Sequence, residues 1–213
     1  CPCISPEFDA KNGVPISAIM FGGRRARLMP LVVEARDWQH GVYLGATLSS
    51  ETTAAAVGAV GVVRHDPMAM LPFCGYNMAD YFAHWLKMQT RTSPDKLPRI
   101  FSVNWFRMDG KGKYLWPGFG ENVRVLKWIV ERVRDGKPGT VESPIGLLPE
   151  TAALDQAGLQ LEDGGLDQLL SVDVEAWQKE AERSTQFLSK FGAHMPEALW
   201  DEHRQLKARL GVA

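Results

Sequence analysis

Residues 101–122 gather aromatic side chains around a Gly/Pro-rich loop, in the run FSVNWFRMDGKGKYLWPGFGEN. A planar ligand can stack between such rings at little entropic cost, because glycine and proline hold the loop in conformations that helices and central strands do not use. Asn122 ends the run and could read the edge of a stacked ring through its side-chain amide. Aromatic clusters are also typical of an ordinary hydrophobic core, so the composition leaves both interpretations open.

Two arginines follow a pair of glycines at the end of an apolar run, residues 15–21. The glycines let the backbone approach a ligand closely, and the planar guanidinium of Arg24 or Arg25 suits phosphate or carboxylate oxygens. Adjacent arginines are also common as solvated surface charge. His40 lies on an apolar segment, where a histidine is more often a hydrogen-bonded core residue than a catalytic acid or a metal ligand.

Small and nearly uncharged residues dominate the segment 50–62. Such a segment can order and disorder at low cost, which is what a lid over an active site requires. The alternative is an Ala-rich helix with a flexible end. The candidate lid residues are Ser50, Glu51, Thr52, Thr53, Ala54, Ala55, Ala56, Val57, Gly58, Ala59, Val60, Gly61 and Val62.

The elements that would position these residues are strands and amphipathic helices. Residues 15–21 and 99–107 are apolar and rich in β-formers, which predicts two strands. Apolar residues recur at helical spacing within 76–88, 123–133, 174–191 and 199–210, and Gly136 marks the end of the second of these helices. Its predicted apolar face consists of Val123, Leu126, Ile129, Val130 and Val133. Residues 135–150 are rich in glycine and proline, which predicts a long surface connection.

The composition argues against two broad classes of partner. The 213 residues carry 24 Lys and Arg against 25 Asp and Glu, so bulk charge favours neither nucleic acid nor an anionic membrane surface. No apolar run is long enough to span a bilayer, and no signal peptide is visible. The three cysteines form no even framework, which indicates a reducing, cytoplasmic setting. The chain begins at Cys1 with loop-like sequence and no initiator Met, so we expect Cys1 to be a cut end.

The sequence resembles GTP-dependent phosphoenolpyruvate carboxykinase, closely from about residue 13 to 133 and loosely afterwards. The matching words are PISAIMFGGRR, WQHGVYLGA, SSETTAAA, HDPMAMLPF, GYN, NWFR and LWPGFGEN. The resemblance implies a nucleotide site formed by Trp105, Phe106, Tyr114, Phe119, Gly120 and Asn122, in which aromatic rings hold guanine and Asn122 bonds the base. It also implies that Arg24 contacts the transferred phosphoryl group, that Arg25 supports the loop, and that residues 52–62 form a mobile Ω-loop lid. Two departures are Tyr114, which is Phe in animal members, and the uncharged VGAVGV of the lid.

The resemblance implies an α/β protein with a mixed sheet flanked by helices, the C-terminal nucleotide-binding part of that enzyme. Within 1–213 we expect a lid and guanine-binding core at 13–135 and C-terminal helices at 151–213. The intact enzyme would be a monomer that converts oxaloacetate and GTP to phosphoenolpyruvate, CO2 and GDP in gluconeogenesis. It would use Mn2+ and Mg2+, whose ligands belong to sequence before this chain, as does the phosphate-binding loop. We therefore expect no metal site in this chain and no activity from the chain alone.

A non-catalytic purine-nucleotide-binding fragment is the alternative function. In the carboxykinase interpretation the partners are GTP, oxaloacetate, phosphoenolpyruvate and the remainder of the same enzyme, with no nucleic acid and no membrane. The intact mass and the encoding frame would distinguish the two functions, because residues before Cys1 would complete the enzyme.

Overall fold

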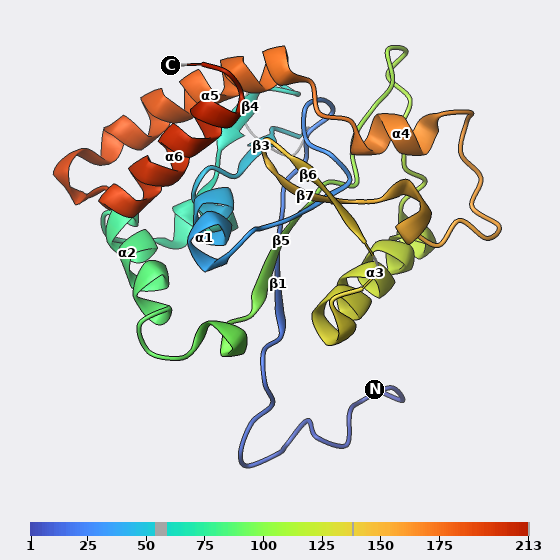
Figure 1. Ribbon diagram of the computed structural model, residues 1–213, viewed down its shortest axis with the longest axis horizontal. Helices are drawn as coiled ribbons and strands as arrows, with labels where there is room; N and C mark the ends of the chain where they lie inside the picture. The colour runs from blue at the N-terminus through green and yellow to red at the C-terminus, as the bar shows by residue number, and fades with distance from the viewer. Residues whose placement is uncertain (54–58, 138, 213) are drawn as a thin grey trace.

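The computed structural model describes residues 1–53, 59–137 and 139–212. Within them, five strands form one mixed sheet in the order β1-β5-β2-β7-β6, and β3 and β4 form a separate hairpin (Figure 1). β1 runs parallel to β5, whereas the other pairings among the described strands are antiparallel. The strands are β1 Ala18–Gly22, β2 Val32–Glu34, β3 Ser49–Glu51, β4 Val63–His65, β5 Arg99–Val103, β6 Thr140–Ser143 and β7 Gly146–Pro149.

Helices cover both faces of the main sheet, with α1, α2, α5 and α6 on one side and α3 and α4 on the other (Figure 1). This confirms an α/β architecture with a mixed sheet flanked by helices. The α-helices are α1 Trp38–Ala46, α2 Met78–Met88, α3 Asn122–Asp135, α4 Gly165–Leu170, α5 Val174–Leu188 and α6 Glu197–Arg209. Short 3-10 helices are η1 Pro67–Ala69, η2 Leu71–Phe73, η3 Pro94–Lys96, η4 Phe119–Glu121, η5 Thr151–Ala153 and η6 Ser189–His194. None of the described helices has both the length and the apolar character needed to cross a membrane.

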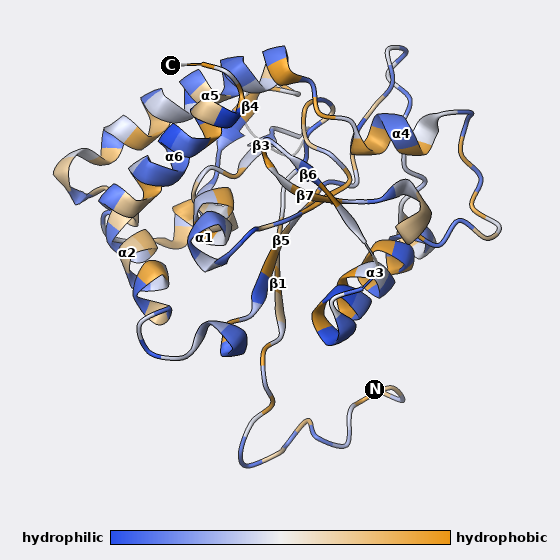
Figure 2. Ribbon diagram, viewed as in Figure 1, coloured by the Kyte–Doolittle hydropathy of each residue, from blue (hydrophilic) through white to orange (hydrophobic). Residues whose placement is uncertain are grey.

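Alternation along the strands explains why one sheet supports two cores. Val33 of β2 and Ile100 of β5 pack with α1, α2, α5 and α6. Their neighbours Val32 and Phe101 pack with α3 and α4 on the opposite face. Successive side chains of a strand point to opposite faces, so each strand contributes to both layers. Figure 2 shows hydrophobic residues along β1 and β5 and hydrophilic residues on the outward sides of α5 and α6.

Four of the α-helices fall in segments whose apolar spacing predicts a helix: α2, α3, α5 and α6. Gly136 ends α3 in the left-handed conformation, with φ 66°, as its position predicts. The predicted apolar face of α3 is wrong in part, because the helix carries two apolar stripes and the sheet buries the one that contains Val125 and Trp128. The members of the predicted face that remain exposed are Val123, Leu126 and Val130.

The prediction of a surface connection at 135–150 is wrong. β6 and β7 form a hairpin there, and β7 pairs with β2, so the hairpin extends the main sheet. Its Pro144 lies in the turn and Pro149 ends β7, while Ile145 and Leu148 are buried in the core beneath α1. Each strand has only four residues, so it contributes few apolar side chains to the sequence pattern. The surrounding glycine and proline residues dominate that pattern and indicate a loop.

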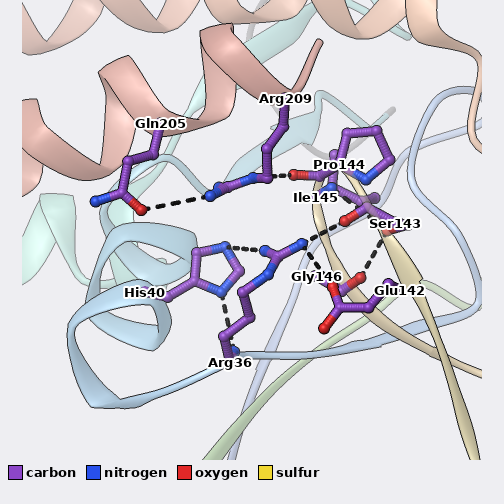
Figure 3. A network of polar contacts seen from close by, with 9 residues as sticks. All are labelled: Arg36, His40, Glu142, Ser143, Pro144, Ile145, Gly146, Gln205 and Arg209. Carbon is purple, nitrogen blue, oxygen red and sulfur yellow. Dashed lines mark hydrogen bonds and ion pairs between the residues drawn. The ribbon is translucent and has the colours of Figure 1, made fainter.

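His40 is buried on α1 and belongs to a polar network that ties α1 and α6 to this hairpin (Figure 3). Its Nδ1 accepts a hydrogen bond from the backbone N–H of Arg36 at 3.1 Å. The Arg36 guanidinium donates to the carbonyl of Ser143, and Nε of Arg209 donates to the carbonyl of Pro144 at 2.8 Å. Two arginines thus hold the turn between β6 and β7, and His40 is a hydrogen-bonded core residue.

Replacing His40 with Asn should make the protein less sensitive to acid. Burial, followed by the charges of Arg36 and Arg209, lowers the pKa of His40 from 6.5 to about 3. As the pH falls below 6.5, the imidazole binds a proton in the unfolded chain but not in the folded chain. The unfolding free energy therefore decreases from pH 6.5 down to the pKa of His40 in the folded state. Between pH 7 and pH 4 the unfolding free energy of the wild type should fall by about 3 kcal/mol more than that of His40→Asn, measured by urea denaturation.

Asn offers an acceptor oxygen near the position of the imidazole Nδ1 but does not titrate, so the hydrogen bond from Arg36 is retained. The matched control is His84→Asn on α2, because His84 is exposed. A pH dependence that is the same in His40→Asn and in the wild type would contradict the role given to His40.

Candidate functional site

The carboxyl ends of β1 and β5 place two of the predicted site residues beside each other. Parallel pairing sets Gly22 opposite Val103, so the loops that follow both strands leave the same edge of the sheet. Arg24 in the first loop lies over the ring of Phe106 in the second, with its guanidinium carbon 3.9 Å from the ring centroid. The ring quadrupole attracts a cation in this position. A cationic group and a flat apolar surface therefore meet at one point, which is the combination that a nucleotide's phosphates and base require.

The loop that carries Arg24 is fastened to β3. A Cβ on Gly23 would lie 2.6 Å from the carbonyl oxygen of Ser49, so only glycine lets β3 pass this closely. The backbone N–H of Arg24 donates to Oγ of Ser50 at 3.0 Å, and the N–H of Glu51 donates to the carbonyl of Arg24 at 2.7 Å. The first residues of the candidate lid therefore bond to both backbone polar groups of Arg24.

Asn104, which was not among the predicted site residues, fastens the two loops to each other. Its side chain is buried and 1% exposed. Oδ1 accepts hydrogen bonds from the backbone N–H groups of Arg25 and Phe106, both at 3.2 Å. Nδ2 donates to the carbonyls of Arg25 at 2.8 Å and Met29 at 3.0 Å. One feature of the sequence could have indicated this role. Asparagine is disfavoured in strands, and Asn104 directly follows an apolar strand.

The predicted aromatic residues do not form a closed stack. Phe106 and Tyr114 meet edge to face, with ring centroids 6.2 Å apart and planes at 69°. Phe119 is 100% exposed, and its φ of 49° is strained for a residue with a Cβ. Trp105 is partly buried against the core beneath the site, and Gly120 is exposed. The structure brings two of the three rings together and leaves the third open to solvent.

Asn122 is held in one orientation by a buried indole. Nε1–H of Trp116, a residue that is 2% exposed, donates to the side-chain oxygen of Asn122 at 2.8 Å. An indole N–H can only donate, so the atom that faces it must be the amide oxygen. Among the described residues, the Nδ2 group of Asn122 has no hydrogen-bond partner, which leaves two donors available beside the aromatic loop.

Comparison with known proteins identifies this architecture. The model of the phosphoenolpyruvate carboxykinase C-terminal P-loop domain matches residues 1–209. The chain is 52% identical over 213 residues to phosphoenolpyruvate carboxykinase (GTP) of Neocallimastix frontalis, and this match covers 100% of the chain and 35% of that protein. It is 51% identical over 208 residues to the enzyme of the same name from Renibacterium salmoninarum, covering 98% of the chain and 34% of that protein. The chain belongs to the GTP-dependent phosphoenolpyruvate carboxykinase family. It spans about a third of the length of the curated relatives it matches.

The candidate lid rises from the β3-β4 hairpin. Past the strands, the backbone N–H of Thr52 donates to the carbonyl of Val62 at 2.9 Å, and the N–H of Gly61 donates to the carbonyl of Thr52 at 2.9 Å. Both ends of the segment are therefore held together at its base, and Val60 and Val62 are exposed. The other lid residues of the described chain are Ser50, Glu51, Thr53 and Ala59, whereas Ala54, Ala55, Ala56, Val57 and Gly58 lie outside the described residues.

Arg25, which the resemblance implies supports its loop, is buried and paired with a carboxylate. Its buried guanidinium donates to the two carboxylate oxygens of Glu180 on α5, at 2.7 and 3.3 Å, and to Oγ of Ser49. Burial alone would raise the pKa of Glu180, but the hydrogen bond and charge of Arg25 outweigh burial and lower the pKa overall. The sequence pattern does not single out Glu180, because the alternating charges of α5 are typical of a solvated helix face.

Asn104→Asp should destabilise the protein by roughly 3 kcal/mol, because a carboxylate can no longer donate to two buried carbonyls. The measurement is urea denaturation of the full-length protein that contains this chain. The matched control is Asn77→Asp. Asn77 caps α2 by accepting the N–H of Ala79 at 3.0 Å, which aspartate does equally well. Its Nδ2 donates one long hydrogen bond, to the carbonyl of Phe191 at 3.5 Å, so this control loses a single weak donor contact. Equal stability of Asn104→Asp and the wild type would show that the amide does not join the loops.

Proposed function

We propose that the longer protein to which this chain belongs converts oxaloacetate and GTP to phosphoenolpyruvate, CO2 and GDP, and that this chain supplies the guanine site, a phosphate-contacting arginine and a lid. Family membership supports the reaction. The observation that carries the local assignment is the meeting of Arg24 and Phe106 at 3.9 Å, since it sets a phosphate-binding group beside a base-stacking surface. We further propose that residues 13–135 form the lid and guanine-binding core, and that residues 151–213 support it.

In the proposed reaction, the C–C bond to the departing carboxylate of oxaloacetate breaks and its electron pair remains on an enolate. The enolate oxygen then attacks the γ-phosphorus of GTP, and the bond from that phosphorus to the β-phosphate oxygen breaks, which yields phosphoenolpyruvate and GDP. Such transfers depend on positioning and on neutralising charge at the transferred phosphoryl group. The planar fork of the Arg24 guanidinium can donate two parallel hydrogen bonds to the phosphoryl oxygens.

Divalent metal ions supply further charge stabilisation in phosphoryl transfer. Among the described residues, no group of three or more His, Cys, Asp and Glu is arranged to hold a metal ion. We therefore assign no step to a metal held by this chain. In the proposal, the segment from Ser50 to Val62 closes over the reactants and excludes water from the enolate. Water would otherwise protonate the enolate and give pyruvate instead of phosphoenolpyruvate.

The remainder of the longer enzyme is the proposed partner of an exposed apolar surface. β1 is an edge strand, and its Met20 is 47% exposed. The exposed stripe of α3, which includes Val123 and Val130, adds apolar surface on the face of the sheet next to β1. Unpaired strand edges and contiguous apolar surface are features that proteins normally cover.

Arg24→Lys in the full-length enzyme should lower kcat/KM by at least about tenfold, because an ammonium cannot reproduce the bidentate fork. The assay is phosphoenolpyruvate formation from oxaloacetate and GTP. Arg27→Lys is the control, since Arg27 lies in the same loop and is exposed. Wild-type kcat/KM in Arg24→Lys would remove Arg24 from the site.

Base selectivity should depend on Asn122 and base affinity on Phe119. With its oxygen held by Trp116, the amide of Asn122 presents N–H donors, which suit the carbonyl of guanine or hypoxanthine and oppose the amino group of adenine. Phe119→Ala should weaken GTP and ITP alike, because stacking of about 1 to 3 kcal/mol does not depend on the base. Asn122→Ala should mainly reduce the preference for GTP over ATP, by about 1 to 3 kcal/mol.

Nucleotide binding by the full-length enzyme, measured for GTP, ITP and ATP, tests this division of roles. Asn122→Asp is the informative companion, because its carboxylate can still accept from Trp116 but presents an acceptor instead of a donor to the base. It should disfavour GTP and ITP more strongly than Asn122→Ala does. An unchanged ratio of GTP to ATP affinity in both Asn122 variants would assign edge reading to another group.

A further inference from the structure

A buried charge cluster connects the C-terminal helix α5 to the loop that carries Arg24. Glu180 of α5 accepts from the Arg25 guanidinium at 2.7 and 3.3 Å and from Oγ of Ser49 at 3.3 Å. The three residues are 5% (Arg25), 6% (Ser49) and 6% (Glu180) exposed. A bidentate pair of this kind fixes the relative orientation of its partners, because both hydrogen bonds form only when the guanidinium and carboxylate planes align.

Both partners of Glu180 are direct chain neighbours of site residues. Arg25 follows Arg24, and Ser49 precedes Ser50, whose Oγ accepts the backbone N–H of Arg24 at 3.0 Å. Glu51 completes the link through its N–H bond to the Arg24 carbonyl at 2.7 Å. A displacement of the Glu180 carboxylate would therefore also displace the backbone of Arg24, through Arg25 on one side and through Ser49 and Ser50 on the other.

The same helix also contacts the second arm of the lid hairpin. Phe187, two turns beyond Glu180 on α5, stacks on His65 of β4, with ring centroids 4.2 Å apart and planes at 11°. A groove between α5 and this arm is lined by Val62, His65 and Glu180. α5 thus touches β3 through Glu180 and β4 through Phe187, and these strands are the two arms from which the candidate lid rises.

We infer that Glu180 is a positioning residue for phosphoryl transfer, which acts through Arg25 and Ser49 to hold the Arg24 loop and the base of the lid in their working arrangement. The inference rests on the proposed function. Its role is distinct from reading the edge of the base, because the proposed edge reader, Asn122, is oriented by Trp116 and, among the described residues, is joined to the Glu180 cluster by no hydrogen bond. The inference therefore predicts a separation between base selectivity and turnover.

Glu180→Gln in the full-length enzyme should lower kcat by about 10- to 100-fold, because small misplacements of a reacting group are costly in rate. The ratio of the dissociation constants for GTP and ATP should stay within about twofold of the wild type, because Trp116 and not Glu180 orients Asn122. Glu180→Asp, which keeps the charge, should recover part of the lost kcat. The control is Glu182→Gln, because Glu182 is an exposed glutamate on the same helix.

A double variant separates positioning from stability. Removing a single charge leaves its partner buried and unpaired, which can unfold a protein, whereas replacing both members of a buried pair with apolar residues is often tolerated. Arg25→Met with Glu180→Leu should therefore fold with a Tm near that of the wild type and still show the reduced kcat. Wild-type kcat in the folded double variant would overturn the inference.

Hydrogen exchange gives a readout that does not depend on the reaction. The amides of Arg24 and Glu51 should exchange at least about tenfold faster in Glu180→Gln than in the wild type, while the β6-β7 hairpin stays unchanged. Unchanged exchange at both amides would overturn the positioning role whatever the assay shows. A wild-type enzyme that neither binds GTP nor forms phosphoenolpyruvate would instead contradict the proposed function.

Discussion

The four hydrogen bonds of the Asn104 side chain are the constraint on which the site depends. Parallel pairing of β1 and β5 brings their carboxyl ends to one edge of the sheet, but two loops that leave the same edge can still diverge. The buried amide prevents this, because it bonds to the backbone of Arg25 in one loop and of Phe106 in the other. An amide can do so because it carries donors and acceptors on one planar group, whereas a carboxylate offers only acceptors. The contact between Arg24 and Phe106 follows from this junction.

Two buried glutamates fix the helices around that junction. Glu34 at the end of β2 accepts from Arg99 of β5 and from Arg132 of α3, each at 2.8 Å, and so ties α3 to the amino end of β5. Glu180 ties α5 to the loop after β1. Buried ion pairs add little net stability because desolvation offsets their attraction, so their consequence here is orientation. A different buried carboxylate therefore anchors α3, which begins at Asn122, and the loop that carries Arg24.

The sequence predicted the fold class, the strand before Gly22, four helices and the family, because long periodic segments and rare-residue words carry those signals. It did not predict the β6-β7 hairpin, whose strands are short and bounded by glycine and proline. The prediction of the buried stripe of α3 was wrong in part. The helix carries two apolar stripes, and only tertiary packing decides which of them is buried. Glu180 and Asn104 were missed for a common reason, since a polar residue acquires its role from partners far away in sequence, here 155 positions for Glu180 and 79 for Asn104.

The proposed base site combines an amide that is held by the core, on Asn122, with aromatic rings that are exposed to solvent, on Tyr114 and Phe119. Trp116 is buried and holds the amide of Asn122, so the hydrogen-bonding group is oriented before any ligand arrives. Phe119 is fully exposed on a strained backbone beside Gly118, whose φ is 74°, and Tyr114 is 47% exposed. Binding energy from stacking must therefore offset the ordering of exposed rings, whereas edge reading carries no such cost. In the proposed function, selectivity is thus set by the folded core, and affinity by surface residues that can vary without altering the choice of base.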